Sequence, residues 1–159
     1  MDTLTTLFSH NLWANLQLLD LCAQLSDEQL DSTLVGTYGA IRETFEHIAV
    51  AERSYITRIH TGLPYRYPKN APPMTLAEIG EWLRVSGTDL IESASKVAPD
   101  ETVSVDQQGI PHAVPKKILL TQTINHATEH RSQIMTILTQ LSIQPPDLDA
   151  WTLFFDEMN

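Results

Sequence analysis

Residues 119–141 have the sequence LLTQTINHATEHRSQIMTILTQL, and their pattern sets the architecture of the chain. Apolar residues and two histidines recur here at intervals of three or four, the period of an α-helix with one buried face. The members of this stripe are Leu119, Thr123, His126, His130, Ile134, Ile137 and Leu141. The stretch predicts a helix that begins after Pro115 and ends near Leu141, before two prolines, with both histidines on its buried face.

Three further segments show the same helical periodicity. We expect helices over about residues 3–24, 40–60 and 75–97. Gly62 is a natural cap for the end of the second helix, and Thr75 begins the third as the first residue of a capping box. The chain therefore contains four long helices.

The connections after the second and third helices are long. Residues 64–73 contain four prolines, which predict an irregular crossing. Residues 99–115 alternate polar and apolar side chains around Gln107-Gln108-Gly109, which predicts a short hairpin or extended excursion. The first connection is shorter and favours antiparallel packing of the first two helices, whereas the order of the others stays open.

Helices of this number and length predict one all-α domain over residues 1–159. Four helices of about 20 residues are each roughly 30 Å long and can pack side by side as a four-helix bundle. The expected fold is thus a four-helix bundle with long crossing connections and a short extended excursion before the last helix.

The composition argues against nucleic acid and membranes as partners. Lys and Arg number 10 against 20 Asp and Glu, a formal net charge of −10 that repels phosphate backbones and anionic lipid surfaces. No apolar run approaches the roughly 20 residues that cross a bilayer, and the first residues lack the order of a signal peptide. The single cysteine, Cys22, fits a reducing compartment, so we expect a cytoplasmic protein.

Three histidines are the candidate metal ligands. His126 and His130 are four residues apart, so their rings lie on one face of the helix, and His47 lies in the second helix beside small residues. Three neutral imidazoles with an open coordination position are typical of a catalytic metal site. The alternative is a set of core histidines that bond to hydroxyl and carbonyl groups.

The remaining polar candidates have weaker signals. His10, His60 and His112 are expected to be solvated. Glu43 lies one turn before His47 and could act as a general base on that face, whereas Glu129 is less well aimed.

Several segments resemble the DinB/YfiT-like family of damage-inducible four-helix proteins. They are His10-Asn11-Leu12-Trp13-Ala14-Asn15, residues 41–52 with His47, residues 125–131 with both other histidines followed by Gln133-Ile134, and the final Pro-Asp-Leu. The histidine triplet, in this order and with its long gap, is the specific part of the resemblance.

The resemblance implies a homodimer in which His47, His126 and His130 hold zinc or nickel. It also implies thiol-dependent S-transferase or isomerase chemistry on a small electrophile, with a low-molecular-weight thiol such as mycothiol or bacillithiol. Two alternatives are a metal-dependent hydrolase and a non-catalytic stress protein that binds a metal or small molecule. A third is a metal-free bundle whose function is dimerisation.

Overall fold

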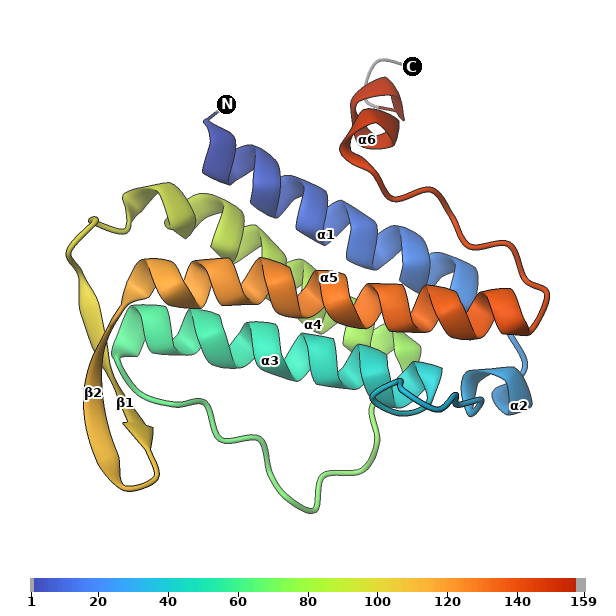
Figure 1. Ribbon diagram of the computed structural model, residues 1–159, viewed down its shortest axis with the longest axis horizontal. Helices are drawn as coiled ribbons and strands as arrows, with labels where there is room; N and C mark the ends of the chain where they lie inside the picture. Colours follow the sequence, from blue (N-terminus) through green and yellow to red (C-terminus); the bar gives the residue numbers. More distant parts are fainter. Residues whose placement is uncertain (1, 157–159) are drawn as a thin grey trace.

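The computed structural model describes residues 2–156, and four long helices make up most of it (Figure 1). These helices are α1 (Thr3–Cys22), α3 (Ile41–Thr61), α4 (Leu76–Ser93) and α5 (Lys116–Gln140). The smaller elements are α2 (Asp27–Leu30), the 3-10 turn η1 (Ala94–Lys96), β1 (Thr102–Gln107), β2 (Ile110–Pro115) and α6 (Ala150–Asp156). The expected four-helix bundle is confirmed, and α2 and α6 are additions to it.

The four helices pack in the order α1, α4, α3, α5 around the bundle. Each of α1 and α3 packs against both α4 and α5, so α1 and α3 face each other across a diagonal. The prediction that the first two long helices are packed neighbours is therefore wrong. The connection between them holds α2 and a loop, which is enough chain to reach the diagonal position.

The direction of the helices explains the course of the connection between α3 and α4. In Figure 1, α3 and α4 run the same way, so residues 64–73 must return along the length of the bundle. Prolines suit this crossing, because an extended chain there needs no helical hydrogen bonds.

Where α1 meets α4, Gly87 permits close packing, since a Cβ there would lie 2.7 Å from Leu12 Cδ1.

Local sequence signals fix the ends of the helices. Asp2 caps α1 by accepting a hydrogen bond from Thr5 N at 3.0 Å. The predicted capping box of α4 is present, since Thr75 N donates to Glu78 Oε2 at 2.8 Å and Glu78 N donates to Thr75 Oγ1 at 3.2 Å. Gly62 ends α3 with φ +72°, a conformation that other residues rarely adopt.

The extended excursion is a β-hairpin. β1 and β2 pair antiparallel, with Gln107 opposite Ile110. The two turn residues, Gln108 and Gly109, have φ of 56° and 83°, as a tight hairpin turn requires. The hairpin buries Val103 against one end of the bundle.

Two apolar clusters fill the bundle. One contains Ile41, Phe45, Ile48, Leu83 and Ile134, among others, and the second contains Phe8, Ile56, Leu90 and Leu120. Four of the buried polar residues contact one another in the interior of the bundle: Asn11, Asn15, Glu52 and Arg131. We call these four the polar layer.

The polar layer is a hydrogen-bond network that leaves one buried atom, Glu52 Oε2, without a partner among residues 2–156. Asn11 and Asn15 each donate through Nδ2 to Glu52 Oε1, at 2.8 and 2.9 Å. Arg131 Nη1 donates to the oxygens of the same two amides, at 2.8 and 2.7 Å. Burial raises the pKa of Glu52 and lowers that of Arg131 to about 10. The two asparagines therefore bridge a buried anion and a buried cation from α1, α3 and α5.

Candidate metal centre

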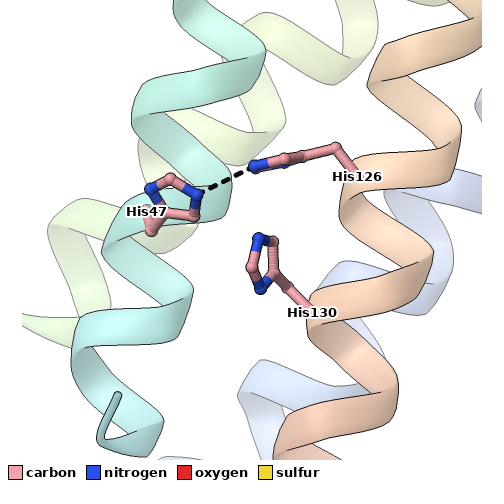
Figure 2. Close-up of side chains that lie close together, drawn as sticks. All are labelled: His47, His126 and His130. Atoms are coloured by element: carbon pink, nitrogen blue, oxygen red, sulfur yellow. Dashed lines mark hydrogen bonds between the residues drawn. The ribbon is translucent and has the colours of Figure 1, made fainter. Parts of the chain in front are cut away.

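The three predicted histidines meet between α3 and α5 (Figure 2). His47 projects from the first half of α3, and His126 and His130 project from successive turns of α5. The two helices pack together, and both α5 histidines face His47 because residues four apart share a helix face. The structure thus brings together side chains that are 79 residues apart in the sequence.

Ring nitrogens of the three histidines all lie within 4.8 Å of one another. His126 Nε2 is 2.8 Å from His47 Nε2, and ring centroids are separated by 4.4 to 4.7 Å. In a four-coordinate site with metal–nitrogen distances of 2.0–2.1 Å, neighbouring ligand nitrogens are about 3.3 Å apart. The 2.8 Å contact between His47 and His126 is shorter than this spacing and the 4.8 Å limit for the cluster is longer, so a bound ion would require small shifts of the rings.

The surroundings favour uncharged imidazoles. His130 is 8% exposed, and the other two rings are partly buried. Burial and the nearby His130 lower the pKa of His47. The same causes, with His47 in addition, lower the pKa of His126 to about 4. At neutral pH His47 and His126 are therefore uncharged and carry lone pairs, as metal ligands must.

Gln133 fixes the orientation of His130. Its Oε1 is 2.9 Å from His130 Nδ1 and also accepts a hydrogen bond from the backbone N of Tyr38 at 3.1 Å. A proton on His130 Nδ1 suits this contact and leaves Nε2 free to bind a ligand. The Tyr38 ring then stacks on His47, with centroids 4.0 Å apart.

The cluster fits a bound cation. One proton shared at the 2.8 Å contact satisfies His47 and His126, but within residues 2–156 no donor faces the second ring nitrogen of His130. His126 Nδ1 is also buried without a partner in this part of the chain, but it is Nε2 of this ring that faces His47. A divalent ion among the three rings would satisfy the converging lone pairs, and imidazole suits zinc and nickel alike.

A cavity of about 590 Å³ lies beside His47. Glu43 lines it, as its spacing from His47 predicts, whereas Glu129 borders a different hollow beside the loop at residues 34–37. The full lining is Tyr38, Glu43, Glu46, His47, Val50, Tyr67, Ala71 and Pro73. The proline-rich crossing therefore forms one wall of the cavity, which meets the cluster at His47.

The other three histidines lie away from the cluster. His60 and His112 are exposed, as expected, and His60 contacts Asp89 Oδ1 at 2.8 Å. His10 is partly buried, and its Nε2 is 2.7 Å from the carbonyl oxygen of Leu148. The expectation that His10 is solvated is wrong, because the C-terminal segment folds back over α1.

Two residues of the site escaped the sequence analysis. Gln133 is three residues after His130, a spacing at which helical side chains meet, so a search for partners of each histidine would have found it. Tyr38 has no such signal, because a loop brings it to His47 from outside both helices. Cys22 is buried and its pKa is raised to about 12 by burial, which fits a core residue.

Within residues 2–156, no helix has both the length and the apolar character needed to cross a membrane.

Comparisons with known proteins place the chain in a family. A DinB-like protein from Bacillus cereus ATCC 10987 has a similar fold, with a TM-score of 0.59 and 22% identity over 87% of this chain and 91% of that one. The comparison with curated proteins found no match. The model of the DinB family matches residues 1–157. The chain therefore belongs to the DinB family.

Proposed function

We propose that this protein is a metal-dependent enzyme that transfers a small thiol to an electrophile, with His47, His126 and His130 as the ligands of zinc or nickel. The observation that carries the proposal is the convergence of three ring nitrogens within 4.8 Å beside a cavity of about 590 Å³. Three protein ligands and access for a small molecule are typical of catalytic rather than structural metal sites.

The chain's own residues prepare this site. Burial keeps His47 and His126 uncharged, and Gln133 holds His130 with one nitrogen free. Tyr38 covers the outer face of His47 and forms the mouth of the cavity. A bound divalent ion would supply Lewis acidity, which lowers the pKa of a thiol so that the nucleophilic thiolate is present at neutral pH.

A transferase assay tests this proposal. Zinc- or nickel-loaded protein is mixed with monochlorobimane and, in turn, cysteine, coenzyme A and bacillithiol, and thioether formation is followed by fluorescence. We expect thiol-dependent turnover in the wild type and in His112→Ala, whose histidine lies on the exposed hairpin, and none in His47→Ala. If no thiol supports turnover in the loaded wild type with this or other common electrophiles, the transferase assignment fails.

A hydrolase is the second candidate. Glu43 lines the same cavity as His47, which supports a role as general base toward water. Turnover of an ester or amide without any added thiol, lost in both His47→Ala and Glu43→Ala, would favour this reaction. Dependence on a thiol would favour the transferase.

We also propose a homodimer. Exposed apolar side chains at both ends of the chain support it, and α6 carries the largest of them, Trp151, at 71% exposure. Light scattering should give twice the chain mass of 17.9 kDa. The mass of a single chain at micromolar concentration would refute the dimer.

A further inference from the structure

The cavity beside His47 carries only one sign of charge. Two of its lining side chains, Glu43 and Glu46, are acidic, and two others, Tyr38 and Tyr67, are aromatic. The crossing at residues 64–73 contains two cations, Arg66 and Lys69, but neither lines the cavity. Any small molecule that approaches His47 therefore passes carboxylates and aromatic rings, without a basic side chain to offset them among the lining residues.

The carboxylate of Glu43 is held in place at the rim. Its Oε2 accepts a hydrogen bond from the backbone N of Ala40 at 3.1 Å, which caps the start of α3. A Cβ at position 39 would lie 2.5 Å from this same oxygen, so a larger residue than Gly39 would displace the carboxylate from this position. Only one oxygen of Glu43 is used in this way, so the group keeps an oxygen free to face a ligand.

Glu46 has a different role. Its two oxygens accept hydrogen bonds from Tyr67 Oη at 3.1 Å and from Met74 N at 3.0 Å. Glu46 therefore fastens the end of the crossing to α3 and shapes the cavity wall. Its charge adds to the negative potential, but Glu43 is the carboxylate with capacity left to bind.

Carboxylates combined with aromatic faces favour positively charged ligands. The exposed side of Tyr38, which is 54% exposed and stacks on His47, offers a π-face at the mouth of the cavity. A carboxylate attracts an ammonium group and repels a carboxylate by Coulomb's law, and the net charge of −10 acts in the same direction.

We propose that this cavity selects thiol substrates that bear an amine over those that bear a carboxylate, and that Glu43 determines this selectivity. The inference rests on the proposed function, because it assumes that a thiol reaches the metal held by the three histidines. The inference concerns which charge is preferred on the thiol substrate, and the three histidines do not determine that preference.

Three small thiols test the inference on nickel-loaded protein: cysteamine, 2-mercaptoethanol and 3-mercaptopropionate. Binding is followed by the near-ultraviolet absorption band of a nickel–sulfur contact, which needs no turnover. The quantity compared is the ratio of the dissociation constants of 3-mercaptopropionate and cysteamine. The two thiols also differ in intrinsic acidity. Because that difference is the same for every variant, it does not contribute to the change in the ratio between variants.

Glu43→Gln is the variant that removes the charge while keeping an oxygen to cap Ala40. Glu129→Gln is the matched control, because it removes the same charge next to His130 but outside this cavity. We expect the ratio to fall about threefold to tenfold in Glu43→Gln and to change less than about twofold in Glu129→Gln. In the wild type, 1 M salt should reduce the ratio similarly, which tests the charge effect without any substitution.

The outcomes separate this inference from the proposed function. Thiols that bind with the same ratio in the wild type and Glu43→Gln would overturn the selectivity while leaving the transferase intact. A wild type that binds 3-mercaptopropionate more tightly than cysteamine would also overturn it. A nickel-loaded wild type that binds none of the three thiols would overturn the proposed function and this inference together.

Discussion

Two polar clusters share α3 and α5 but differ in how their hydrogen-bond donors and acceptors are paired. The polar layer uses Glu52 of α3 and Arg131 of α5, and the histidine cluster uses His47 and His130, five residues and one residue away. In the polar layer, two amides connect the anion and the cation with four bonds of 2.7 to 2.9 Å. In the histidine cluster, one proton fills the 2.8 Å contact between His47 and His126, and the second ring nitrogen of His130 has no donor among residues 2–156.

The difference separates a structural role from a binding role. Buried donors and acceptors that pair across α1, α3 and α5 fix the positions of these helices, although Glu52 Oε2 has no partner among residues 2–156. Ring nitrogens that converge beside a cavity without enough donors are instead suited to bind a cation. Substitutions in the polar layer should therefore lower the free energy of unfolding, and substitutions in the histidine cluster should weaken metal binding.

Arg131→Met should have the largest effect on stability. It leaves the Glu52 charge and two amide oxygens buried without their cation, which should lower the free energy of unfolding by about 3–5 kcal/mol. Urea unfolding measures the loss. Arg42→Met is the control, since Arg42 pairs with Asp27 and Asp31 at the surface and should contribute about 1 kcal/mol or less.

The contrast between the polar layer and the histidine cluster also predicts the effect of His126→Ala. In metal-free protein this substitution should lower the free energy of unfolding by less than about 1.5 kcal/mol, because it removes a ring that has no partner at Nδ1. If His126→Ala destabilises the metal-free protein more than Arg131→Met does, the assignment of roles to the two clusters is reversed.

Gln133→Leu should weaken metal binding without unfolding the chain. The substitution removes the acceptor for His130 Nδ1 and should reduce zinc affinity about 10- to 100-fold. Competition with a fluorescent chelator measures the affinity. Gln133→Glu keeps an acceptor and should restore most of it, and Gln122→Leu, at an exposed position of α5, should have no effect. Equal affinities in Gln133→Leu and the wild type would remove Gln133 from the site.

The pH dependence of stability should show a small effect. The folded-state pKa of His126 is about 4, below its ordinary value of 6.5, so at lower pH the unfolded chain binds the proton more readily. This contribution to the stability of metal-free protein is complete above pH 6.5 and falls progressively towards pH 4. After allowance for solvent, the loss should be roughly 1–2 kcal/mol. An identical pH profile in His126→Ala would show that this histidine is not its source.

Periodicity made the bundle and the histidine cluster predictable. His126 and His130 share the stripe that contains Ile134 and Ile137, so any bundle places them toward the interior. The diagonal arrangement of α1 and α3 was not predictable, because the connection between them is long enough for either position. The polar layer was missed because Glu52 and Arg131 interrupt apolar faces, and only tertiary structure supplies the asparagines that make their burial possible.

Metal content per chain tests the central claim most directly. Elemental analysis of untagged wild type, His47→Ala and His126→Ala should be compared with His112→Ala, whose histidine lies on the exposed hairpin. We predict close to one zinc or nickel ion per chain in the wild type and His112→Ala, and background metal in the other two. Background metal in the wild type, or equal metal in all four proteins, would contradict the three-histidine centre.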